Sequence, residues 1–238
     1  MNGLTPNCIN DFYFSNPTER DMLELILSRK LPFPFGGKNG ILLHGNWGTG
    51  KTTFAKLLPE LIEYAHSGTW AANNGVGQMP AANADDVHTH IFLCGGGLST
   101  TAITNVINAA NKIHPIWHHS QHDYFVFDEV DKLTLGAQQS LKAVMGLKRC
   151  MFIFTTNYLN KIDAGVINRC HLVEMNQATN PNAYMPIAQS ILTGMGLSTT
   201  AIPMNTLLSH ATNAKGSLRT FTNAVAMDCI KAGGVLVT

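Results

Sequence analysis

The sequence has few charged residues and almost no excess of either sign. Charged side chains make up 13% of the 238 residues, with 16 Lys and Arg against 15 Asp and Glu. A protein that attracts nucleic acid through its overall charge is far more basic, so this class is excluded, although a local basic patch is compatible. The hydrophobic content of 45% excludes a disordered chain and suits one large domain, or one domain with a small satellite.

The sequence also lacks the features of membrane-spanning and exported proteins. It has no apolar run of 18 or more residues, and its N-terminus does not have the basic and then apolar pattern of a signal peptide. The five cysteines are scattered and form no C-x-x-C pair, which favours reduced thiols over disulfides or zinc. We therefore expect a cytoplasmic protein with no membrane partner, with nucleoid association or a viral or phage origin left open.

A glycine-rich stretch, "GNWGTGKTT", occupies residues 45–53 and matches the pattern G-x-x-x-x-G-K-[ST]. It lies between an apolar run at residues 41–45, typical of a buried strand, and a helical repeat of apolar residues that begins at Phe54. Glycines let backbone N–H groups face phosphate oxygens, and the positive end of the following helix attracts the same anion. The predicted nucleotide-binding residues are Gly45, Asn46, Trp47, Gly48, Thr49, Gly50, Lys51, Thr52, Thr53 and Asp128.

Two side chains of this stretch have a predicted chemical role. Lys51 can reach the β- and γ-phosphates of ATP, and the hydroxyl of Thr52 can bind Mg²⁺. Trp47 stands at a variable position of the pattern. We expect its side chain to point out of the loop and to pack on a neighbouring surface.

Polar residues end two further apolar runs. Asp128 and Glu129 end the run at residues 124–129, and Asn157 ends the run at residues 150–157. Ligands of open parallel sheets bind at the carboxyl ends of the strands, so these side chains are expected beside the phosphates. We expect Asp128 to hold Mg²⁺, directly or through water. Glu129 is then placed to polarise an attacking water and Asn157 to orient it.

Strands and helices alternate along the first three quarters of the chain. The predicted strands are residues 41–45, 90–94, 124–129, 150–157 and 170–175, with helices at 15–30, 51–65, 99–112 and 136–146 and a long surface loop at 66–88. Beyond residue 177 the pattern suits helices alone. The sequence therefore predicts an α/β domain at residues 1–176, with a five-stranded parallel sheet between helices, and a small all-helical domain at residues 177–238.

Five segments in order, "GNWGTGKTT", "FVFDEVDKL", "TTN", "INRC" and "GSLR", resemble the motifs of an AAA+ ATPase. The chain is most similar to the small motor subunits of sliding-clamp loaders of the replication factor C type. The spacing of Gln138, Leu141 and Met145 also resembles a pattern of those subunits. The similarity runs from about Ile9 to Ala224, which is most of the chain.

The resemblance implies a role for each matching residue. Lys51 and Thr52 correspond to the Walker A motif, Asp128 and Glu129 to the Walker B motif, and Asn157 to the first sensor. These roles imply hydrolysis of ATP with Mg²⁺ by a P-loop module.

Two arginines are implicated by the resemblance. Arg169 corresponds to the arginine finger, which acts in trans in the site of a neighbouring subunit, and Arg219 to the second sensor on the helical lid. The implied protein is an oligomeric motor or switch of DNA replication, stimulated by assembly and by DNA. Its implied partners are other AAA+ subunits, in a homo- or hetero-oligomer, DNA, and a sliding clamp or another loaded protein.

Some features depart from the clamp-loader pattern. Asn168 replaces the serine expected before Arg169, and only 19 residues follow Arg219, so no collar domain is evident. We expect that either the chain is a fragment or its assembly relies on the ATPase modules alone. A helicase loader or a regulator of transposition shares the same site. A superfamily 3 viral helicase also has the phosphate motif and paired acids, but the separation of 77 residues from Lys51 to Asp128, the arginine of "INRC" and the lid with "GSLR" argue against it. A nucleotide-bound scaffold without hydrolysis is the non-enzymatic alternative.

A DNA contact has weaker support in the sequence. Backbone N–H groups near Gly97 and Ser99 could also meet phosphates. The candidate side chains are Lys112, Lys132, Lys142, Lys148 and Arg149. The histidines between residues 114 and 122 do not favour a metal site, because acid and cysteine ligands are not arranged around them.

Overall fold

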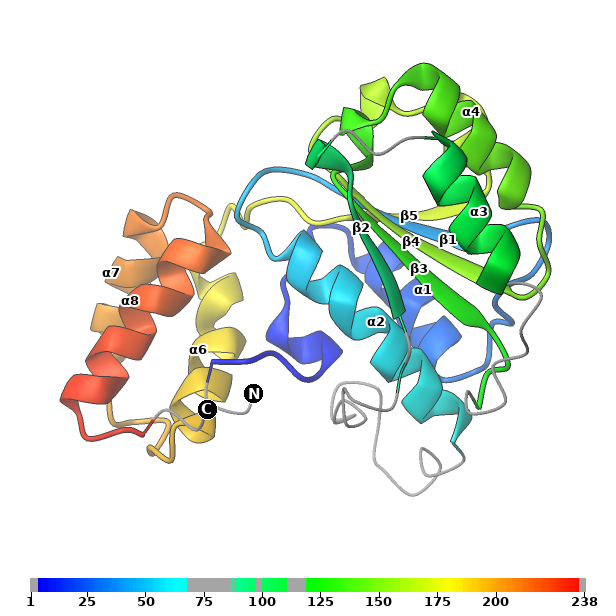
Figure 1. Ribbon diagram of the computed structural model, residues 1–238. Coiled ribbons are helices and arrows are strands. Elements are labelled where there is room, and N and C mark those ends of the chain that lie inside the picture. The colour runs from blue at the N-terminus through cyan, green and yellow to red at the C-terminus, as the bar shows by residue number, and fades with distance from the viewer. Residues whose placement is uncertain (1–3, 68–86, 88, 97–99, 111–118, 236–238) are drawn as a thin grey trace.

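The computed structural model describes residues 4–67, 87, 89–96, 100–110 and 119–235 (Figure 1). One five-stranded sheet has the strand order β2-β3-β4-β1-β5, and every neighbouring pair is parallel. The strands are β1 Gly40–His44, β2 Thr89–Leu93, β3 Asp123–Asp128, β4 Cys150–Thr156 and β5 Cys170–Glu174. This architecture, with helices on both faces, confirms the predicted fold class.

Alternating strand residues face two separate hydrophobic clusters, as a repeat of two residues requires. Ile41 and Leu43 of β1 belong to the cluster under α1 Pro17–Leu27 and α2 Lys51–His66. Leu42 points the other way, into the cluster under α3 Thr100–Ala110, α4 Leu135–Val144 and α5 Ala164–Asn168. The central strands are therefore buried on both sides, which explains why they read as continuous apolar runs.

The first helix is shorter than predicted. Asn16 accepts a hydrogen bond from the backbone of Thr18 and caps α1, which ends at Leu27 and not at residue 30. The cause lies at Arg29, whose φ of 59° takes the backbone out of the helical region. The carboxylate of Glu19 accepts a hydrogen bond from the N–H of Glu174, which ties α1 to the edge strand β5.

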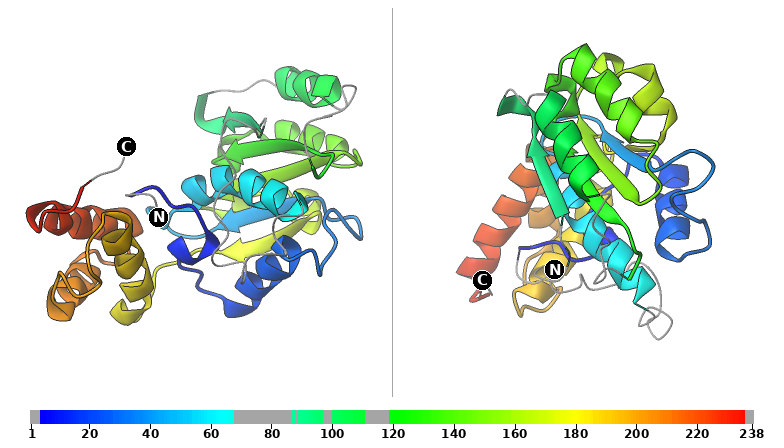
Figure 2. Two further views of the ribbon diagram at one scale, coloured as in Figure 1. Left: turned by 90° about the horizontal axis from the view of Figure 1, so that it is seen from below. Right: turned by 45° about the vertical axis from the view of Figure 1, so that its right-hand side comes forward.

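The helices that follow the sheet have a hydrophobic cluster of their own. They are η8 Pro181–Tyr184, α6 Met185–Gly194, α7 Met204–Asn213 and α8 Leu218–Lys231. Figure 2 shows them beside the sheet, with the N-terminal segment between the two parts. We propose that residues 1–176 and 177–238 are two domains, since the described residues after 177 add helices alone.

The N-terminal segment joins these two parts. Phe12 packs on Phe54 of α2 with ring centroids 4.8 Å apart, whereas Tyr13 packs edge-on against Tyr184 of the helical part at 5.7 Å. The hydroxyl of Ser190 in α6 donates to the carboxylate of the buried Asp11 at 2.6 Å. The first residues thus contact both parts of the molecule, a role that their sequence did not suggest.

Two predicted segments lie partly outside the described residues. The predicted loop at 66–88 begins with the last residue of α2, His66, and with Ser67, and only residue 87 of the remainder is described. Ser99 and Lys112, the predicted ends of the third helix, flank the described α3. None of the described helices is long and apolar enough to cross a membrane.

A buried carboxylate anchors α2, the helix that carries the phosphate motif. Glu63 is 3% exposed and accepts hydrogen bonds from the Tyr124 hydroxyl at 2.6 Å and the His119 N–H at 2.6 Å. The N–H of Ser120 adds a third donor. Burying a carboxylate is unfavourable unless donors surround it, and this network both satisfies the charge and fixes α2 against β3.

We predict that Glu63→Ala lowers the free energy of unfolding by about 3 kcal/mol, because it leaves buried donors without an acceptor. Urea denaturation followed by circular dichroism measures this loss. As a control, Glu24→Ala removes an exposed ion pair with Arg20 and is expected to cost about 0.5 kcal/mol or less. Equal losses in the two variants would contradict the role of Glu63.

Candidate active site

The glycine-rich loop between β1 and α2 adopts a conformation that requires glycine. Gly45 and Gly50 have φ angles of 137° and 94°, in a region that other residues rarely adopt. A Cβ atom at Gly45 would lie 2.6 Å from the carbonyl oxygen of Met175. The loop leads directly into α2, which begins at Lys51. Backbone N–H groups and the helix dipole at this N-terminus favour an anion.

Lys51 lies inside this loop. Its Nζ donates to the carbonyl oxygens of Gly45, at 2.9 Å, and of Asn46, and the residue is 7% exposed. Burial lowers the pKa of the amine to about 8, and the nearby carboxylates, Asp128 first among them, oppose the shift only in part. An anionic phosphate beside the amine would stabilise its charged form and reverse this shift.

The structure brings the two predicted magnesium ligands together. The Thr52 hydroxyl donates to Oδ1 of Asp128 at 2.7 Å, and Thr155 of β4 donates to the same oxygen at 2.6 Å. Mg²⁺ prefers oxygen ligands such as carboxylates, hydroxyls and phosphates. A converging carboxylate and hydroxyl at the start of α2 fit a magnesium ion beside a bound phosphate.

Glu129 directly follows β3, and the chain turns sharply at this residue. Its φ of 57° is left-handed, and its N–H donates to the Thr155 hydroxyl at 2.9 Å. Thr155 therefore holds both acids, which sequence reasoning missed. The two threonines of "TTN" indicate such a contact, because their hydroxyls lie on β4, the strand that neighbours β3.

Asn157 also lies at the carboxyl edge of the sheet. Thr156 is the register partner of His44, so Asn157 lies beside the start of the glycine-rich loop. The Thr156 hydroxyl donates to Asp131 at 2.7 Å and joins this edge of β4 to the acidic segment. Lys51, the paired acids and Asn157 thus share one edge, as predicted.

The helical part rests on the same loop. The backbone N–H of Arg219, in the first turn of α8, donates to the carbonyl oxygen of Gly48 at 3.2 Å. A Cβ atom at Gly48 would lie 2.8 Å from the Ser217 hydroxyl, so α8 approaches the loop closely. Arg219 is therefore on the helix that covers the candidate site.

A cavity of about 320 Å³ opens between the loop, α8 and the N-terminal segment. It is lined by Leu4, Pro6 and Phe12 of the N-terminal segment, by Gly50 of the loop and by Arg219 of α8. The sequence did not predict this cavity, because the residues that close it are far from the phosphate motif in the chain.

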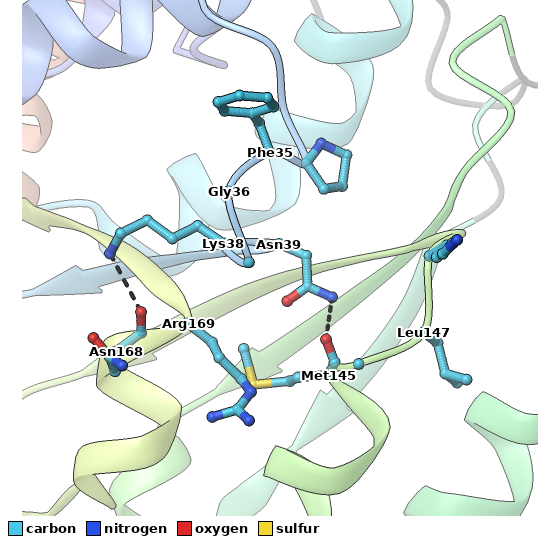
Figure 3. A pocket seen from close by; sticks show the side chains of 12 residues that line it. Phe35, Gly36, Lys38, Asn39, Met145, Leu147, Asn168 and Arg169 are labelled. Carbon is cyan, nitrogen blue, oxygen red and sulfur yellow. Dashed lines mark hydrogen bonds between the residues drawn. The ribbon is translucent and has the colours of Figure 1, made fainter.

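Arg169 lies at the opposite edge of the sheet. It directly precedes Cys170, which pairs with Gly40, the first residue of β1. Its guanidinium donates to the Gly165 carbonyl at 2.9 Å and lines a cleft of about 850 Å³ together with Phe35, Lys38 and Asn39 (Figure 3). β1 has five residues and separates Arg169 from the loop by about 16 Å. The structure therefore does not bring Arg169 into the site of its own chain.

The predicted DNA-contacting residues do not form one stripe among the described residues. Lys132 ends η6 Val130–Lys132 near the acids, whereas Lys148 and Arg149 are exposed before β4 at the other edge. The amine of Lys142 lies 3.4 Å from the Asp163 carboxylate. Gly97, Ser99 and Lys112 lie outside the described residues, as do His114 and His118.

The fold and the site define the class of protein. Residues 41–177 match the family described as AAA, ATPase family associated with various cellular activities, and the chain belongs to this family. The proteins of this class bind ATP with Mg²⁺.

Among individual proteins, DNA polymerase III subunit gamma/tau of Mycoplasma pneumoniae is 24% identical over 217 residues. The match covers 90% of this chain and only 30% of that relative. Two solved structures of Thermotoga maritima RuvB variants have TM-scores of 0.62 and 0.63 at 11% and 12% identity. Each covers 96% of this chain and 72% of the other, and they show the fold alone.

The lowered pKa of Lys51 predicts proton uptake on nucleotide binding. The free amine begins to lose its proton above about pH 7, and a bound phosphate favours the protonated form. Affinity for ADP should therefore fall as the pH rises from about 7 through the free pKa of about 8.

Titration calorimetry at about pH 8.5, in buffers of different ionisation enthalpy, measures the proton uptake directly. Lys51→Arg is the matched control, since arginine stays protonated at this pH. The same uptake in both proteins would show that another group titrates.

Proposed function

We propose that this chain is an Mg-ATP-hydrolysing AAA+ ATPase that works as an oligomeric motor or switch in DNA replication, in the manner of a clamp-loader subunit. The observation that carries the hydrolytic part is the convergence of Thr52 and Asp128, joined by a 2.7 Å hydrogen bond, beside Lys51. At the N-terminus of α2 this arrangement supplies the cation of Lys51 and a pair of oxygen ligands for a metal ion. Glu129, the residue after Asp128, adds a second acid.

Each residue at the carboxyl edge has a proposed part in the reaction. The loop N–H groups and Lys51 bind the phosphates, and Thr52 and Asp128 hold Mg²⁺, which would neutralise charge on the phosphate oxygens. Glu129 polarises the attacking water and Asn157 orients it. These groups act mainly by position and charge, which is what phosphoryl transfer demands of a protein.

The cavity beside the loop is proposed to receive the nucleoside. Its volume of about 320 Å³ and its apolar wall of Leu4, Pro6 and Phe12 suit a flat base. Arg219 and Gly50 also line it, so a nucleotide with its base there would have its phosphates at the start of α2. The helical domain then covers the nucleotide and carries Arg219 as the second sensor.

Arg169 is proposed to complete the site of a neighbouring subunit. Its position at the amino edge of the sheet keeps Arg169 away from the site of its own chain. A guanidinium is well suited to stabilise the charge that develops on the transferred phosphoryl group. Lys38 and Lys148 line the same cleft, which makes this edge basic. A contact between the amino edge of one subunit and the carboxyl edge of the next is head-to-tail, so repeated contacts build a ring or a helical array.

The role in DNA replication rests on the relative, whose name describes a subunit of a DNA polymerase. Sliding clamps, other loaded proteins and DNA are the proposed partners, with the exposed Lys148 and Arg149 as phosphate contacts. Each subunit offers few cations, so DNA affinity would come from summing several subunits and would decrease steeply with salt.

Steady-state ATP turnover, with and without DNA, tests the hydrolytic function. Glu129→Gln keeps the side-chain size but removes the base, so turnover should fall at least about 100-fold while ATP affinity stays unchanged. Retained affinity is the internal control for folding. Unchanged turnover in Glu129→Gln, or no turnover by the wild-type protein under any assembly condition, would contradict the proposal.

A further inference from the structure

Trp47 is the one aromatic residue of the phosphate motif, and its side chain has no part in the proposed reaction. It lies between Gly45 and Gly48, and 62% of its surface is exposed. Its ring packs edge-on against Tyr158, with centroids 5.6 Å apart and an interplanar angle of 79°. Trp47 thus packs on a neighbouring surface, as expected, and that surface is Tyr158 of the same chain.

Tyr158 is the residue that directly follows Asn157, and several contacts hold it in place. Its backbone N–H donates to the Thr156 hydroxyl at 3.0 Å, and that hydroxyl donates to Asp131 at 2.7 Å. The amine of Lys161 lies 4.1 Å from the centre of the Tyr158 ring, on its face. The residues on both sides of Asn157 are thus connected to other elements of the site.

These contacts place one aromatic pair between two parts of the candidate site. Trp47 belongs to the loop that binds phosphate, and Tyr158 belongs to the segment that carries Asn157. The glycines on either side of Trp47 have positive φ angles of 137° and 75°, in a region that glycine adopts easily. Hydrogen bonds from Lys51 and from the Arg219 N–H also hold this loop, and the aromatic pair adds a contact between the loop and the segment that carries Asn157.

We propose that Trp47 and Tyr158 are positioning residues that fix the distance between the phosphate-binding loop and Asn157. This inference rests on the proposed hydrolysis of ATP. Neither ring touches the phosphates in this role. The pair acts through Asn157, whose amide must meet the attacking water within a narrow range of positions. An edge-on aromatic contact of this kind stabilises one arrangement over others by a few-fold to about tenfold.

The pair should therefore affect turnover more than binding. In Trp47→Ala we expect kcat for ATP to fall about threefold to tenfold while KM and ADP affinity change less than about twofold. Trp47→Phe keeps an aromatic edge at this position and should recover most of the loss. Tyr158→Ala should reproduce the loss, and the double variant should be no slower than either single variant, because both remove the same contact.

Two controls separate this role from general damage. Met227→Ala alters an exposed apolar residue on α8, 57% exposed, and should leave kcat unchanged. The mass of the assembly in ATP, measured for wild type and Trp47→Ala, should be the same.

Three results would overturn the inference. They are an unchanged kcat in Trp47→Ala, losses that multiply in the double variant, and a smaller assembly in Trp47→Ala, which would make Trp47 a contact between subunits. A wild-type protein that turns over no ATP contradicts the proposed function itself. Normal wild-type turnover with no effect of Trp47→Ala contradicts this inference alone.

Discussion

All five strands of the sheet run in the same direction, and this determines which residues can share a site. The carboxyl ends of β1, β3 and β4 meet at one edge, so the glycine-rich loop, the paired acids and Asn157 are neighbours. The segment before β5 ends at the other edge, where Arg169 lies. One chain therefore carries the binding groups and the arginine at opposite edges of the sheet, and we propose that assembly brings them together.

Hydroxyl groups on β4 connect the strands at the carboxyl edge. Thr155 donates to Asp128 and accepts from the N–H of Glu129, while Thr156 donates to Asp131. These bonds hold carboxylates close to one another and to Lys51, although like charges repel. A bound cation would offset the repulsion between these carboxylates, and a bound phosphate would pair with Lys51. The arrangement therefore agrees with a site that is preorganised for Mg-ATP.

Much of this organisation could be predicted from the sequence. The strands are buried on both faces and read as apolar runs, and a polar residue at the end of such a run is placed at an edge of the sheet. Lys51, Asp128 and Asn157 are therefore expected together from the sequence, and the alternation of strands and helices predicts the confirmed fold class. Their catalytic roles, and that of Arg219, stay predictions.

The sequence could not predict contacts between distant segments. The periodic spacing of apolar residues indicates which side chains are buried, but it does not indicate which residues they contact. The N-terminal wall of the cavity beside the glycine-rich loop, the shared contact Thr155 and the pairing of Trp47 with Tyr158 all depend on such contacts. The early end of α1 depends on the single left-handed residue Arg29, which has no local glycine signal.

The most direct test of a site shared between subunits is ATP turnover by mixed variants. Glu129→Gln and Arg169→Ala should each be inactive alone, while each still binds ATP. In an equal mixture about a quarter of head-to-tail contacts join an intact acid to an intact arginine, so turnover should return to about a quarter of the wild-type rate. A mixture that stays inactive, or an Arg169→Ala protein that is fully active alone, would contradict a site completed by the neighbouring subunit.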